Sequence, residues 1–96
     1  MLKIPRPIEF EWDKANIEKN KIKHNVSFKE AEEVFINEPL KTLKDIRHSQ
    51  IEDRFIAFGI TNKKRKLYLI FTIRGEKIRI ISARDQSKKE RKYYEK

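Results

Sequence analysis

The spacing of the apolar residues changes once along this chain, near residue 40. The change separates a part that is predicted to be helical from a part that is predicted to form strands. Before it, Phe28, Ala31, Val34 and Phe35 recur at the spacing of one helix face. After it, apolar residues alternate with polar ones or form short runs bounded by turn residues, as in strands. We therefore expect an α+β domain with two N-terminal helices, a sheet and a C-terminal helix.

Capping residues mark where the predicted helices begin. Asp13 precedes the first helix, where a short polar side chain accepts hydrogen bonds from free backbone amides. Ser27 with Glu30, and Ser87 with Glu90, form capping boxes for the second and the last helix. The last helix is expected over residues 88–95, and the apolar face of the first helix is expected to consist of Ala15, Ile22 and Val26.

The predicted sheet is antiparallel and has three to four strands. A hairpin joins residues 54–60 to residues 67–73, and a third strand follows over residues 77–83. A shorter edge strand is expected around residues 40–43. Strands that follow one another in sequence tend to pair, so the helices should lie on one face of this sheet. With 96 residues the chain is expected to form a single domain, in which residues 1–7 are a loose arm.

The charge balance favours an anionic partner. The 24 lysines and arginines outnumber the 15 acidic residues, which gives a net charge of +9. A field of this strength attracts nucleic acid first, with an acidic protein or a membrane surface as weaker candidates.

The residue types that are missing narrow the chemistry and the compartment. The chain has no cysteine, which excludes disulfides, a thiol nucleophile and a cysteine metal site, and which fits the cytosol. Its two histidines lie far apart with no third ligand at a metal-binding spacing, so neither a metal nor a cofactor is expected. The longest apolar run, residues 67–73, is too short to span a bilayer, and no signal peptide is visible. The protein is therefore expected in the cytoplasm, with no membrane partner.

Arginines on two neighbouring strands form the first candidate site. Alternation places Ile78, Ile80 and Ser82 on one face of the third strand, and Arg79, Ile81 and Ala83 on the other. A tight turn brings Thr72 and Arg74 beside Arg79, and Arg84 follows at the end of the strand. Guanidinium groups bind phosphate through two parallel hydrogen bonds and stay protonated. The cluster is therefore either a phosphate-binding site or the solvated face of a basic sheet.

His48 and Glu52 form the second candidate site because their side chains could exchange protons near neutral pH if their surroundings shift their pKa values accordingly. They lie four residues apart and lead into the strand that begins near Arg54. Metal-free RNA cleavage needs a base for the 2′-hydroxyl, a positive group beside the phosphate and an acid for the leaving oxygen. The pair could supply the base and the acid, or could be a surface histidine beside a solvated acidic turn.

Further basic residues could contact an RNA backbone. Lys63, Lys64 and Lys66 lie at the hairpin turn, where a solvated tip that discourages edge aggregation is the simplest interpretation. His24 ends the first helix, where a histidine interacts favourably with the helix dipole and is at least as well explained by that structural role.

Four segments of the chain, taken in order, carry a resemblance to a known family. They are Phe10-Glu11-Trp12-Asp13, Val26-Ser27-Phe28, His48-Ser49 with Glu52-Asp53-Arg54-Phe55, and Ile78 to Arg84. This ordered set resembles the BrnT family of ribonuclease toxins. The resemblance implies a RelE-like α+β fold and a type II toxin that cleaves RNA and arrests translation and growth. It also implies a cognate antitoxin with a ribbon-helix-helix domain. Operator DNA would then be bound by the antitoxin and not by the toxin itself.

The same resemblance favours the functional interpretation of both candidate sites. The expected catalytic residues are then His48, Glu52, Arg54, Arg79 and Arg84. The expected RNA contacts are His24, Lys63, Lys64, Lys66, Thr72 and Arg74. A transesterification that leaves a 2′,3′-cyclic phosphate is the reaction that these side chains permit without a metal. Two alternatives stay open: a non-catalytic nucleic-acid-binding module, and a protein-interaction domain for an acidic partner.

Overall fold

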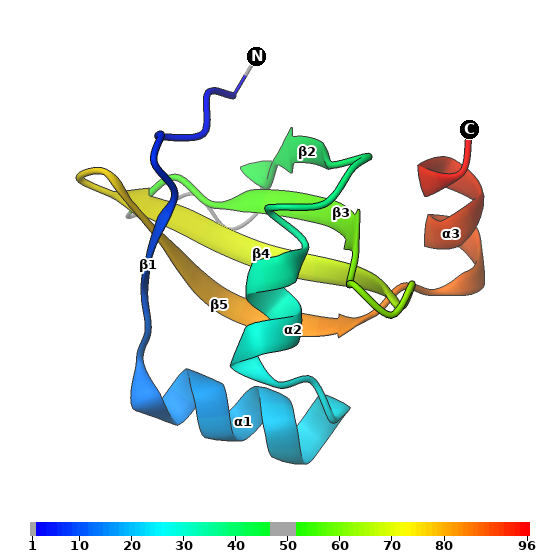
Figure 1. Ribbon diagram of the computed structural model, residues 1–96, viewed down its shortest axis with the longest axis horizontal. Helices are drawn as coiled ribbons and strands as arrows, with labels where there is room; N and C mark the ends of the chain where they lie inside the picture. The colour runs from blue at the N-terminus through cyan, green and yellow to red at the C-terminus, as the bar shows by residue number, and fades with distance from the viewer. Residues whose placement is uncertain (1, 47–51) are drawn as a thin grey trace.

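The computed structural model describes residues 2–46 and 52–96 and contains a sheet and three helices in this part of the chain (Figure 1). The elements, in order, are β1 (Glu9–Glu11), α1 (Lys14–His24), α2 (Phe28–Glu33), β2 (Lys41–Lys44), β3 (Phe55–Ile60), β4 (Lys66–Arg74), β5 (Lys77–Asp85) and α3 (Lys88–Tyr94). The α+β class and the predicted hairpin, third strand and edge strand are confirmed.

The sheet has five strands in the order β1-β5-β4-β3-β2 and is mixed. Strand β1 pairs in parallel with β5, whereas the other neighbours are antiparallel. The prediction of an antiparallel sheet with three to four strands is therefore wrong. Strand β1 is three residues long and pairs with a segment far along the chain, so it leaves no alternating pattern in the sequence.

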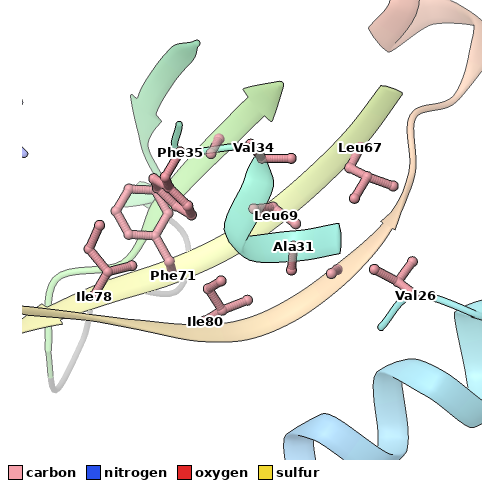
Figure 2. Close-up of a cluster of buried hydrophobic side chains, with 11 residues drawn as sticks. Val26, Ala31, Val34, Phe35, Leu67, Leu69, Phe71, Ile78 and Ile80 are labelled. Atoms are coloured by element: carbon pink, nitrogen blue, oxygen red, sulfur yellow. The ribbon is translucent and has the colours of Figure 1, made fainter. Parts of the chain in front are cut away.

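The hydrophobic core lies between α2 and one face of the sheet (Figure 2). Ala31, Val34 and Phe35 pack there against the inward residues of β4 and β5, and the Phe35 and Phe71 rings meet edge to face at 5.0 Å.

Helix α3 stands apart from α1 and α2, beside the ends of the long strands (Figure 1). It contacts the opposite face of the sheet, where Tyr93 packs on Phe58 at 5.0 Å, so the prediction that the helices lie on one face is wrong for α3. The sheet therefore has a helix-covered face and an opposite face, here called the open face.

The predicted capping residues act as expected. Asp13 accepts a hydrogen bond from the backbone of Ala15, and both predicted capping boxes are formed.

The predicted apolar face of α1 is wrong, because Ala15 is exposed and Ile22 is 85% exposed. The helix instead turns Asn20 inward, and the Asn20 Oδ1 atom accepts a hydrogen bond from the backbone of Ala83. A polar residue at a buried helix position cannot be recognised from apolar spacing. Val26 is buried, but it lies in the link after α1.

A β-bulge in β5 changes which of its side chains share a face. Ile70 pairs with Ser82 and Phe71 pairs with Ile80, so Ile81 is an extra residue. The bulge reverses the alternation: Ala83 is buried in the core with Ile80, and Ser82 joins the open face. The predicted grouping of Ser82 with Ile78 and Ile80 is therefore wrong.

The N-terminal segment is not a loose arm. Leu2, Ile4 and Ile8 are partly buried against the core, so residues 2–7 belong to the packed domain. Apolar residues without periodicity gave no sequence signal for this packing.

Among the described residues, no helix is long and apolar enough to cross a membrane.

Candidate functional site

The open face of the sheet carries a hollow of about 480 Å³. Its lining consists of Asp45, Arg54, Ile56, Tyr68, Ile70, Ile81 and Ser82. Ile56, Ile70 and Ser82 are neighbours across three strands, because Ile56 pairs with Ile70 and Ile70 pairs with Ser82. The sheet therefore holds these side chains in place, and the floor consists mainly of isoleucines.

Arg54 is the predicted catalytic residue that lines the hollow. It lies two residues after Glu52 and directly precedes β3. Its carbonyl accepts a hydrogen bond from the backbone of Asp45 at 2.8 Å, which joins the two residues at one end of the hollow. Asp45 is only 8% exposed. The hollow thus has a cationic and an acidic side chain at the same end.

Tyr68 is a lining residue whose surroundings shift the pKa of its side chain. Burial raises the pKa of the Tyr68 phenol, and the nearby Arg84 charge offsets this only in part. The guanidinium of Arg84 lies 3.9 Å from the centre of the Tyr68 ring, and the Phe58 ring meets the tyrosine edge to face at 5.4 Å. The Tyr68 ring is therefore fixed between two neighbours, and its hydroxyl keeps its proton at neutral pH.

Arg84 lies beside the hollow, and its guanidinium is hydrogen-bonded to other residues of the protein. It donates to both carboxylate oxygens of Glu90, at 2.8 and 2.9 Å, and to the carbonyl of Asp85 at 3.0 Å. The hydrogen bonds raise the pKa of Arg84 and lower the pKa of Glu90. Because Glu90 also accepts from the backbone of Ser87 in the capping box, Arg84 fastens the start of α3 to the sheet.

Arg79 and Arg74 form a separate network near the β4–β5 turn. Arg79 donates to Glu11 at 2.8 Å and to Asp13 at 3.1 Å, and it is 20% exposed. Arg74 lies 3.5 Å from Glu52 and 3.8 Å from Glu11. Three carboxylates balance these two cations, so the predicted arginine cluster is divided and largely compensated.

Thr72 is not available to RNA. Its side chain is 2% exposed, and its hydroxyl donates to the carbonyl of Asp53 at 2.6 Å. The prediction of an RNA contact at Thr72 is therefore wrong, because the residue lies under the chain that enters β3.

The remaining predicted residues lie away from the hollow or outside the described residues. Lys63 and Lys64 are exposed in the β3–β4 turn, and Lys66 forms an ion pair with Glu95. His24 ends α1, and its carbonyl accepts a hydrogen bond from Arg65 at 3.2 Å. His48 lies outside the described residues, so its place relative to the hollow stays a prediction.

Three polar residues of the lining, besides its isoleucines, were not predicted as site residues. Tyr68 had a usable signal, since a tyrosine alternates with Leu67 and Leu69 and must face away from the core. Ser82 is assigned correctly only once the bulge is known. Asp45 follows the short edge strand and gave no signal in the sequence.

Within residues 2–46 and 52–96, no group of three or more His, Cys, Asp and Glu side chains is placed to hold a metal ion.

Comparisons with known proteins identify the class of this molecule. Residues 12–90 match the family described as "Ribonuclease toxin, BrnT, of type II toxin-antitoxin system". The fold is similar to the 1.1 Å crystal structure of the Brucella abortus ribonuclease toxin BrnT, with a TM-score of 0.66 and 25% sequence identity. That match covers 84% of this chain and 99% of the Brucella chain. No curated protein matches the chain.

The class is therefore that of ribonuclease toxins from type II toxin–antitoxin systems. Within this class, the chain belongs to the BrnT family.

Proposed function

We propose that the chain cleaves RNA in the hollow of the open face by a metal-independent transesterification. The observation that carries the proposal is that the Arg54 guanidinium and the Tyr68 hydroxyl belong to residues that line one hollow. The family is described as one of ribonuclease toxins, which supports RNA cleavage as the reaction of the hollow.

The proposed reaction needs one proton removed and one proton delivered. A base takes the proton of a ribose 2′-hydroxyl, and the 2′-oxygen attacks the adjacent phosphorus while the bond to the 5′-oxygen breaks. The products are a 2′,3′-cyclic phosphate and a 5′-hydroxyl. Arg54 stabilises the charge that grows on the non-bridging oxygens, because its guanidinium offers paired donors to a phosphate. Tyr68 is a protonated donor for the leaving oxygen.

His48 and Glu52 are proposed for proton transfer on the evidence of the sequence. Glu52 contacts Arg74 at 3.5 Å, which places its carboxylate in the network at the β4–β5 end. Arg79 and Arg84 contribute to the site through the elements that they hold in place, since their hydrogen-bonding groups are occupied by carboxylates.

The apolar floor favours an unpaired nucleotide as substrate. Ile56, Ile70 and Ile81 form a flat, non-polar surface on which the face of a base can rest. Bases in single-stranded RNA can be splayed out and placed against such surfaces, whereas bases in a duplex are stacked and inaccessible.

The proposed partner is a cognate antitoxin with a ribbon-helix-helix domain, which also provides the contact to operator DNA. We propose that it inhibits by covering the open face around Arg74, Arg79 and Arg84. Occlusion implies that antitoxin and RNA exclude each other. Simultaneous binding of both to one inactive toxin molecule, measured by ultracentrifugation, would rule out this mode of inhibition.

Growth arrest by variants of the lining tests the site. Tyr68→Phe removes one hydroxyl, and Arg54→Lys keeps the charge but loses the paired donors, so each should lower the cleavage rate by about 100-fold. Tyr93→Phe is the matched control, because Tyr93 packs on Phe58 and is not part of the lining. Full toxicity of folded Tyr68→Phe and Arg54→Lys proteins would refute the site. RNA binding without any cleavage by the parent protein would support the non-catalytic binding module instead.

A further inference from the structure

Six exposed lysines lie on segments at one end of the long strands, beyond the Tyr68 end of the hollow. There the end of α1, the β3–β4 turn and the start of α3 lie together (Figure 1). Arg65 holds these segments in place: its guanidinium donates to the carbonyls of His24 and Asn25 at 3.2 and 2.9 Å, and to both carboxylate oxygens of Asp85 at 2.6 and 3.1 Å. Arg65 therefore ties the end of α1 and the end of β5 to the β3–β4 turn, and α3 begins three residues after Asp85.

Exposed lysines from all three segments form a surface that is here called the lysine end. They are Lys21 and Lys23 in the last turn of α1, Lys63 and Lys64 in the β3–β4 turn, and Lys88 and Lys89 in the first turn of α3. Within the described residues, none of them forms an ion pair. The nearby carboxylates of Glu30 and Asp85 share the single cation of Arg65, so they leave one negative charge beside the six lysines.

The contrast with the arginines of the open face shows what the lysine end can do. Arg74, Arg79 and Arg84 are each held by carboxylates, so the open face contributes little uncompensated charge through them. The lysine end keeps its charge and has the mobile ammonium groups that follow a phosphate backbone of variable path. Lysine is depleted in protein–protein interfaces, so this composition fits a nucleic acid better than an acidic protein.

We propose that the lysine end binds the phosphate backbone of the RNA beyond the nucleotides held in the hollow. This inference rests on the proposed function, because it assumes that RNA occupies the hollow. Tyr68, the lining residue nearest the β3–β4 turn, lies four residues from Lys64, which is ~14 Å along the strand. An RNA of one or two nucleotides that fills the hollow therefore leaves most of the lysine end uncovered, whereas a longer RNA binds both.

The test compares a short and a long single-stranded RNA, both 2′-O-methylated so that the parent protein binds without cleaving them. The variant is Lys63→Gln with Lys88→Gln. The matched control is Lys14→Gln with Lys77→Gln, which removes the same charge from exposed lysines at the opposite ends of α1 and β5. Equal melting temperatures establish that both variants are folded.

For the long RNA, the slope of log affinity against log salt should fall by about 1.4 in the Lys63/Lys88 variant, since each lost phosphate contact on a single strand removes ~0.7. The Lys14/Lys77 control should have the same slope as the parent protein. With the short RNA, the parent, the variant and the control should all have the same slope.

Equal slopes for the variant and the control with the long RNA would overturn the inference, even if unmodified RNA is cleaved normally. Polyglutamate that binds as tightly as the long RNA, with the same dependence on Lys63 and Lys88, would overturn it in favour of an acidic protein partner. If the parent protein neither binds these RNAs nor cleaves their unmodified forms, the proposed function itself fails and the inference falls with it.

Discussion

Replacing Arg65 by methionine should destabilise the fold more than any other removal of a partly exposed charge near the sheet. The Arg65 side chain is 25% exposed and makes hydrogen bonds to two carboxylates and two backbone carbonyls. Methionine keeps much of the apolar stem but none of the donors. The Asp85 side chain is 62% exposed, so water can replace part of its hydrogen bonding to Arg65. The free energy of unfolding should therefore fall by about 2 kcal/mol. For a domain of this size, that lowers the melting temperature by roughly 10 °C.

The effect should depend on pH in a defined direction. The hydrogen bond from Arg65 lowers the pKa of Asp85. Burial alone would raise the pKa of Glu30, but hydrogen bonds from Ser27 and Arg65 outweigh it and lower the value. Carboxylates whose pKa is lowered by folding stabilise the fold above their unfolded pKa, near about 4, and lose this contribution as the pH falls through the folded value. The stability difference between the parent and Arg65→Met should therefore be largest near neutral pH and shrink between pH 4 and pH 2.

Chemical denaturation at several pH values measures both expectations, with Arg74→Met as the control. Arg74 is 49% exposed and its ion pairs are long, at 3.5 and 3.8 Å, so its loss should cost less than about 1 kcal/mol. Equal costs for the two variants, or a cost for Arg65→Met that does not change with pH, would refute the role given to Arg65.

The remaining predictions concern packing, metal independence and the arginine network. A Cβ added at Gly59 would lie 2.3 Å from the Val34 Cγ1 atom, so Gly59→Ala should cost about 1–3 kcal/mol in denaturation, and adding Val34→Ala should recover part of it. Cleavage should persist in EDTA, and loss of activity with recovery on adding a divalent ion would contradict the metal-free reaction. Arg79→Ala leaves Glu11 and Asp13 without their shared cation, so its melting temperature should fall. An unchanged melting temperature would show that these pairs contribute nothing.

Local signals were sufficient to predict most elements of the fold. Capping boxes at Ser27 and Ser87 depend on residues three positions apart, and the hairpin depends on apolar runs beside a turn. Strand β1 could not be predicted in this way, because its pairing with β5 is decided by contacts far apart in sequence. The bulge at Ile81 was equally hidden, since one extra residue in a strand leaves the composition of the strand unchanged.

The candidate site was predicted less completely than the fold. Arg54 was identified because it begins a strand in a segment resembling the family, and it does line the hollow. Arg79 and Arg84 were expected to act together on phosphate, but Glu11, Asp13 and Glu90 occupy their donors. Ion pairs between residues distant in sequence cannot be inferred from spacing, so the sequence indicated where cations lie and not which of them are free to bind.

Mapping the ends of the cleavage products tests the central claim most directly. Purified parent protein and Arg54→Ala are incubated in EDTA with a defined RNA, with and without ribosomes, and both new ends are identified chemically. We expect the parent to leave 2′,3′-cyclic phosphate and 5′-hydroxyl ends, and the folded Arg54→Ala protein to cleave at least about 100-fold more slowly. Products with 5′-phosphate ends, or cleavage by Arg54→Ala at the parent rate, would contradict transesterification in the hollow of the open face.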